Sequence, residues 1–223
     1  MSKLFAVCLG LSTLALYGVA RADDQKSAPA IVHSTCFMCH TEHGNDPALE
    51  FVPRLAAQTQ TYIEGQLKAF RDGSRAGPAA TIYMFPITQG LSDAQIKEAA
   101  AWFASQPPPA PFPSDDLAEK GRSIYKNGVL ASQVPPCSSC HGDKAAGNGI
   151  FPRLAGQNPE YLLAQLRYFR SGVRNDQGAD IIKARIKKYD IDADFCHGYG
   201  YLGFNSRQSK TLRAWEKDFK SLN

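Results

Sequence analysis

The chain has 223 residues, of which 43% are hydrophobic and 21% charged, and its formal net charge is +4. It contains no cluster of lysine and arginine interleaved with aromatic residues, which argues against a nucleic-acid-binding protein. Beyond the N-terminal segment there is no run of about 20 apolar residues, so no transmembrane helix is expected in the mature chain.

Residues 1–22 have the features of a secretory signal peptide. Lys3 precedes an apolar stretch from Leu4 to Ala20 that is too short to span a bilayer, and residues 20–22 (Ala-Arg-Ala) fit a cleavage site with small flanking residues. We therefore expect a soluble mature chain that begins near Asp23 and resides in the periplasm. Cleavage removes two positive charges and no acidic residue, which lowers the net charge from +4 to +2.

The first motif of the mature chain is a C-x-x-C-H pentapeptide formed by Cys36, Cys39 and His40. Each thiol can bond one vinyl group of a haem, and the adjoining imidazole can then bind the iron from one side. Half a zinc site or a redox disulfide also uses C-x-x-C, but neither needs a histidine directly after the second thiol. The motif therefore predicts covalently attached haem.

The same pentapeptide returns at Cys137, Cys140 and His141, which predicts a second haem. A longer stretch is also duplicated: residues 51–58 (FVPRLAAQ) return as residues 150–157 (IFPRLAGQ), a spacing of 99 residues. Internal repetition of this kind indicates tandem copies of one unit.

The two predicted copies cover residues 23–106 and 115–223. Between them, residues 107–114 are rich in proline and can be neither helix nor central strand, so they are expected to form an extended, stiff linker. Each copy is small for a self-sufficient core, and a buried porphyrin is expected to supply much of its apolar contact.

Both copies are predicted to be helical, because no long alternation of apolar and polar residues occurs; the fold class is all-α. Ser92 begins a capping box ahead of a helix with apolar residues at positions 96, 99, 100 and 103. Asn158 and Pro159 begin another helix, which Gly172 ends. A further helix over residues 117–126 is expected to lead into the second motif.

These features together resemble dihaem class I c-type cytochromes of the cytochrome c4 family. The resemblance rests on both C-x-x-C-H sites, the doubled Pro-Arg-Leu-Ala-x-Gln stretch and residues 84–93, and it covers roughly residues 28–182. It implies two small helical domains, each around one covalently attached haem c group, that shuttle electrons in the periplasm.

The resemblance also implies axial ligands. In such domains a methionine on a later loop provides the second axial ligand, and the mature first half contains only Met38, inside the attachment loop, and Met84. Because Met38 cannot reach across the ring, we expect His40 and Met84 to bind the first iron. This pair favours ferrous iron and raises the reduction potential.

Two further pairs of residues follow from the resemblance. Pro53 and Pro152 occupy the place where a backbone carbonyl accepts the second imidazole proton and fixes the orientation of the ligand. Arg54 and Arg153 are expected to pair with haem propionates, with a solvated surface charge as the alternative.

The second half departs from this pattern, because no methionine follows His141. A strict 99-residue offset matches Met84 with Lys183, whereas alignment by eye to the ligand loop of the family places Ile182 there. Three outcomes stay open for the second iron: Lys183 or a neighbouring lysine binds it, His197 binds it, or it stays five-coordinate.

The tail from about residue 188 is also atypical, since it is rich in glycine where the first half has a capped helix. One hypothesis is a change of reading frame near this position, which the gene sequence would test.

We interpret the chain as an electron carrier that turns over no substrate. Its expected partners are redox proteins of a respiratory chain, such as a membrane cytochrome complex and a haem-copper terminal oxidase, with peripheral association at the membrane. The alternative is a peroxidase-like haem enzyme, or the cytochrome subunit of a dehydrogenase, that uses a five-coordinate second haem. A haem-based gas sensor is a third alternative, but no output domain is recognisable.

Overall fold

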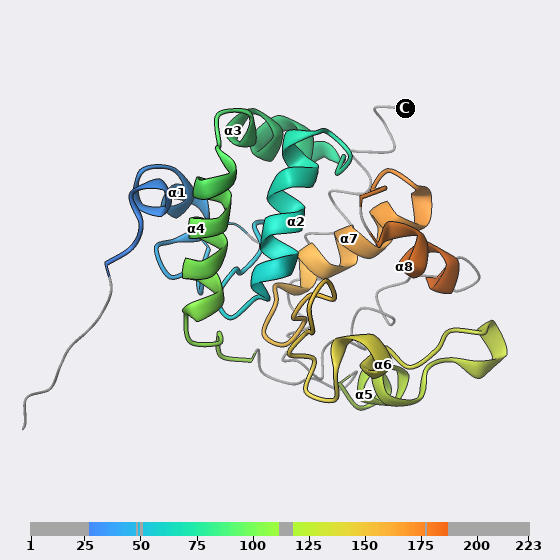
Figure 1. Cartoon of the computed structure of the whole chain (residues 1–223). Coiled ribbons are helices and arrows are strands. Elements are labelled where there is room, and N and C mark those ends of the chain that lie inside the picture. The colour runs from blue at the N-terminus through green and yellow to red at the C-terminus, as the bar shows by residue number, and fades with distance from the viewer. Residues whose placement is uncertain (1–26, 48, 50, 112–117, 177, 187–223) are drawn as a thin grey trace, which may run out of the picture.

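A computed structural model of the chain describes residues 27–47, 49, 51–111, 118–176 and 178–186. Over these ranges the protein consists of helices and long loops, with isolated β-bridges and no strand (Figure 1). The prediction of an all-α fold is therefore confirmed. The expected signal peptide, His197 and the atypical tail lie outside the described residues.

The first lobe runs from blue to green in Figure 1. In chain order it contains η1 (Val32–Cys36), α1 (Phe37–His40), α2 (Gln60–Arg71), η2 (Ala80–Met84), α3 (Phe85–Gln89) and α4 (Asp93–Ser105), where η1 and η2 are π-helical turns. Helices α2 and α4 lie side by side, and Val32, Ile63, Ile96 and Phe103 fill the core of this lobe. The predicted capping box is confirmed, since Ser92 and Gln95 make both of its hydrogen bonds at the start of α4.

The second lobe runs from yellow-green to orange. It contains α5 (Ala118–Asn127), a 3₁₀ turn η3 (Leu130–Ser132), α6 (Ser138–His141), α7 (Pro159–Ser171) and α8 (Ala179–Ile186). Helix α7 begins as predicted, because the Asn158 side chain accepts a hydrogen bond from the backbone N–H of Glu160, and Gly172 ends it at φ +79°. The helix expected over residues 117–126 is α5, one residue further on.

The chain between the lobes is extended after α4, and it packs against the second copy of the repeated stretch. Pro109 is buried there, and a Cβ on Gly156 would lie 2.9 Å from its carbonyl oxygen. Because Gly156 also has a φ of +70°, a larger residue would be both strained and obstructed.

The lobes join through the repeated stretch itself. The Gln58 side chain donates to the carbonyl of Arg153 (3.1 Å) and accepts from its N–H (2.6 Å). In the reverse direction, the Gln157 side chain donates to the carbonyl of Arg54 (2.8 Å) and accepts from its N–H (2.8 Å). The same residues thus contact each other from both sides, as in a twofold-symmetric dimer fused into one chain.

Candidate haem-binding sites

Each C-x-x-C-H motif forms a short helix whose last residue is the histidine. The Nδ1 atom of His40 lies 2.9 Å from the Pro53 carbonyl oxygen, and that of His141 lies 2.8 Å from the Pro152 carbonyl oxygen. Since a carbonyl only accepts, Nδ1 carries the proton in both rings and Nε2 keeps its lone pair for a metal. The loops from histidine to proline span 13 and 11 residues, yet they produce the same contact.

Burial prepares the same residues for metal binding. It lowers the pKa of both His40 and His141, which keeps the imidazoles neutral, the form that binds iron. Burial also raises the pKa of Cys36 to about 11, so this thiol stays protonated. Cys39, by contrast, is exposed.

A continuous, predominantly apolar cavity extends across both lobes. All four motif cysteines, both motif histidines, Pro53, Pro152, Arg54, Arg153 and Met84 line it. Met38, by contrast, is 77% exposed. Two pairs of thiols, two imidazoles with a free Nε2, and an apolar wall are what covalently attached haem requires. The residues present therefore fit two haem groups.

The turn η2 and helix α3 line the cavity with residues 80, 83, 84 and 87, and the second lobe lines it with residue 178 and with residues 181, 182, 185 and 186 of α8. Residues 80, 83, 84 and 87 have the same spacing as residues 178, 181, 182 and 185, and the offset between these two sets is 98 residues instead of 99. This segment of the first lobe contains the π-helical turn η2, in which the N–H of Phe85 bonds to the carbonyl of Ala80, five residues earlier. Such a turn contains one extra residue. Ile182, and not Lys183, therefore lies at the position of Met84.

Lys183 does not line the cavity. Its Nζ atom lies 2.9 Å from the place that a Cβ on Gly172 would occupy, at the C-terminal end of α7. A cation is favourable at this end of a helix because the last carbonyls carry partial negative charge.

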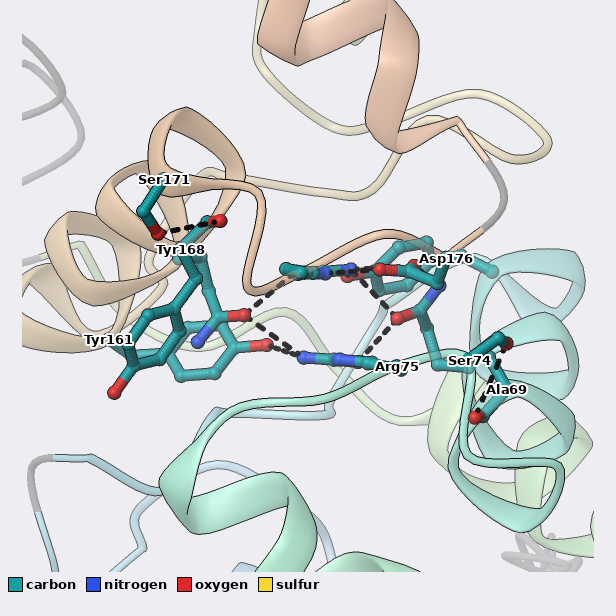
Figure 2. Close-up of polar contacts among 11 residues, drawn as sticks. Ala69, Ser74, Arg75, Tyr161, Tyr168, Ser171 and Asp176 are labelled. Carbon is teal, nitrogen blue, oxygen red and sulfur yellow. Dashed lines mark hydrogen bonds and ion pairs between the residues drawn. The ribbon is translucent and has the colours of Figure 1, made fainter.

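A buried polar network connects the lobes and also lines the cavity (Figure 2). Arg75 and Arg174 form its centre, and each donates to the side-chain oxygens of both Gln66 and Gln165. Arg75 also donates to the Tyr161 hydroxyl at 2.7 Å. The guanidinium groups lie 4.3 Å and 4.2 Å above the rings of Phe70 and Phe169, respectively. Arginine, glutamine, tyrosine and phenylalanine each recur in the second copy at an offset of 99 residues. The network is therefore almost symmetric.

Asp176 breaks that symmetry. It pairs with Arg174 at 2.7 Å and accepts from the Gln66 amide at 2.9 Å, and its side chain is 1% exposed. Burial alone would raise the pKa of Asp176, but the hydrogen bond and charge of Arg174 outweigh burial and hold that pKa below its usual range. Two buried guanidinium groups face this one carboxylate, so the cluster is cationic and suited to further carboxylates.

Sequence reasoning missed this network. It did not single out Tyr62 and Tyr161, whose hydroxyls accept hydrogen bonds from Arg174 and Arg75. The available signal was the presence of arginine and glutamine at matching positions in both copies.

Arg54 and Arg153 bond to the backbone in this structure. Arg54 donates to the carbonyls of Gly156 (2.9 Å) and Ala110 (3.3 Å), and Arg153 donates to that of Ala155 (3.0 Å). Their pairing with propionates stays a prediction.

Comparison with known proteins gives consistent results. The cytochrome c family profile matches residues 26–107 and 118–194. Cytochrome c-552 from Acidithiobacillus ferridurans is 42% identical over 175 residues, covering 77% of this chain and 74% of the relative. A thiosulfate dehydrogenase electron acceptor from Thiomonas intermedia is 33% identical over 173 residues, covering 75% of this chain and 76% of the relative.

A solved structure, cytochrome c4 from Acidithiobacillus ferrooxidans, superimposes with a TM-score of 0.66 at 38% identity, covering 74% of this chain and 95% of the other. Within the described ranges, no helix has the length and apolar character needed to cross a membrane.

Proposed function

Because the chain belongs to the cytochrome c family, as a dihaem protein of the cytochrome c4 type, we propose that it carries electrons between redox proteins in the periplasm. The observation that carries this proposal is the pair of C-x-x-C-H sites on one cavity, each with its imidazole oriented by a proline carbonyl. Haem, when bound, supplies a one-electron iron couple.

The residues of the chain hold and tune that couple. We propose that the four motif cysteines anchor the two porphyrins and that His40 and His141 bind the irons through Nε2. Pro53 and Pro152 fix the orientation of the imidazoles. The thioether of Met84 stabilises the ferrous form in the first lobe. The apolar wall of the cavity keeps water away, which raises the reduction potential further.

The cationic network supplies charge at the centre of the cavity. We propose that Arg75 and Arg174 bind haem propionates, because both arginines line the cavity and, among the described residues, Asp176 is the carboxylate that pairs with Arg174. Arg54 and Arg153, which also line the cavity, are proposed to add donors at its edge.

The proposed domains are residues 23–106 and 115–223, joined by residues 107–114. We propose export by the signal peptide 1–22, and partners that include a membrane cytochrome complex and a haem-copper terminal oxidase. The electron-acceptor name of the Thiomonas relative supports a role as the recipient of electrons from another redox protein.

The test is expression of the full chain with an intact maturation apparatus for c-type haem. We expect a mass equal to the mature polypeptide plus two haem groups, and reversible one-electron titration of both. Replacing Cys36 and Cys39 by alanine is expected to remove one haem, and replacing Cys137 and Cys140 to remove the other. A bare polypeptide from the unmodified gene would contradict the proposal.

A second candidate function is a peroxidase-like enzyme or the cytochrome subunit of a dehydrogenase. Ile182 at the position of Met84 is the observation in its favour, since a carbon side chain cannot bind iron. Sustained peroxide consumption by the dihaem protein, lost in His141→Ala but kept in His40→Ala, would support it.

A further inference from the structure

We infer that the second lobe contains a binding site for small exogenous haem ligands, carbon monoxide on ferrous iron and cyanide on ferric iron, at the position that Met84 occupies in the first lobe. The inference rests on the proposed attachment of haem to Cys137 and Cys140 with His141 as iron ligand. It assigns an activity to the second lobe that electron transfer does not require.

The first step of the argument is the alignment of the two cavity walls. Residues 80, 83, 84 and 87 correspond to residues 178, 181, 182 and 185, because the two sets line the cavity with the same spacing. At the matching position the first lobe presents a thioether and the second lobe presents the side chain of Ile182. A hydrocarbon has no lone pair for iron.

The second step concerns the rest of α8. The residues of this helix that line the cavity are Ile181, Ile182, Arg185 and Ile186, none of which bears sulfur, imidazole or a primary amine. Ile186 is 2% exposed. In the described part of the chain, α8 therefore offers the second iron an apolar wall without a donor.

The third step rules out the amine of Lys183 as a ligand of the second iron. Lys183 is adjacent to Ile182 in sequence, but in a helix neighbouring residues point about 100° apart. Its ammonium lies against Gly172 at the end of α7 and not on the cavity wall. To reach the iron, Lys183 would have to leave its favourable position at the C-terminal end of α7.

Arg185 gives the site a preference among ligands. It follows Ile182 by three residues on the same cavity-lining face and is exposed, so its guanidinium lies at the rim. A cation at the rim attracts an anion such as cyanide and has little effect on neutral carbon monoxide.

The experiment is a titration of the purified dihaem protein with cyanide in the ferric state and with carbon monoxide in the ferrous state, followed by absorption spectra. We expect one haem of the two to bind each ligand. In Ile182→Met, cyanide affinity at that haem is expected to fall at least tenfold, and a second methionine-ligated ferric spectrum should appear.

Two matched variants keep the test sharp. Met84→Ile should leave the first iron without its methionine ligand, so that both haems bind carbon monoxide. Arg185→Leu should weaken cyanide binding several-fold and leave carbon monoxide binding unchanged, which a merely structural role of Arg185 would not produce.

The inference is wrong if both haems of the unmodified protein are six-coordinate and neither binds ligand, or if His197→Ala or Lys183→Ala is needed before the second haem binds. A protein with fewer than two haems by mass would instead contradict the proposed function. The two failures are therefore distinguishable.

Discussion

The two lobes share the side of the cavity that carries the histidine, and they differ on the helix that follows Arg75 in the first lobe and Arg174 in the second. Both rings donate to a proline carbonyl at nearly the same distance, although the connecting loops differ by two residues. In the first lobe the next helix presents Met84, and in the second it presents Ile182. Duplication of the fold therefore preserved the histidine side of the cavity but not the residue at the position of Met84, the proposed second ligand.

A substitution in the core of the first lobe gives the largest expected effect on stability. Phe103 on α4 is 2% exposed and packs in the cluster that joins α2 and α4. Phe103→Ala should lower the free energy of unfolding by about 4 kcal/mol, because it leaves a cavity. Urea titration, monitored by circular dichroism, measures this loss in the free energy of unfolding.

Phe85→Ala is the matched control, since Phe85 is 40% exposed. It should cost less than about 1 kcal/mol. Equal losses in the two variants would show that α4 does not provide the core of the first lobe.

Removing the negative charge of Asp176 should have the next largest effect on stability. Asp176→Asn leaves the buried Arg174 without its anionic partner, which should lower the free energy of unfolding by about 3 kcal/mol. The first lobe has Gly77 at the matching position, so no equivalent charge exists there. An unchanged stability would mean that other carboxylates neutralise Arg174 in the haem-loaded protein.

The same carboxylate predicts a pH dependence. Because the folded pKa of Asp176 lies below its unfolded value of about 3.9, its contribution is present above that pH and is lost as pH falls through the folded pKa. The unmodified protein should therefore lose more stability than Asp176→Asn when acidified below about pH 4.

The repeated glutamines test the symmetric part of the interface. Gln58→Ala and Gln157→Ala each leave one backbone N–H and one carbonyl of the opposite lobe without their partner, so each should cost about 2 kcal/mol. Nearly equal losses are expected. A loss confined to one variant would show that the interface is not equivalent from both sides.

The smallest expected effect is at the residue after each motif histidine. Thr41 has a φ of +62° and Gly142 a φ of +79°, a region that favours glycine. Thr41→Gly should raise the free energy of unfolding by up to about 1 kcal/mol, and Gly142→Thr should lower it by about that amount. Because a Cβ on Gly142 meets no atom within 4 Å, that loss is purely conformational.

Local signals in the sequence predicted the helices well. Ser92 and Asn158 mark the starts of α4 and α7, because capping depends on residues within one turn. The sequence could not decide between Ile182 and Lys183, since the offset of 98 residues in this segment follows from which side chains line the cavity. The pairing of Arg75 with Tyr161 joins residues 86 positions apart and follows from how the lobes pack.

Magnetic circular dichroism of the oxidised dihaem protein tests the difference between the lobes most directly. We predict one low-spin iron with histidine and methionine ligands, lost in Met84→Ile, and one high-spin iron without a methionine signal. Two low-spin irons with the same ligand signature would contradict the assignment of Met84 and Ile182 to matching positions.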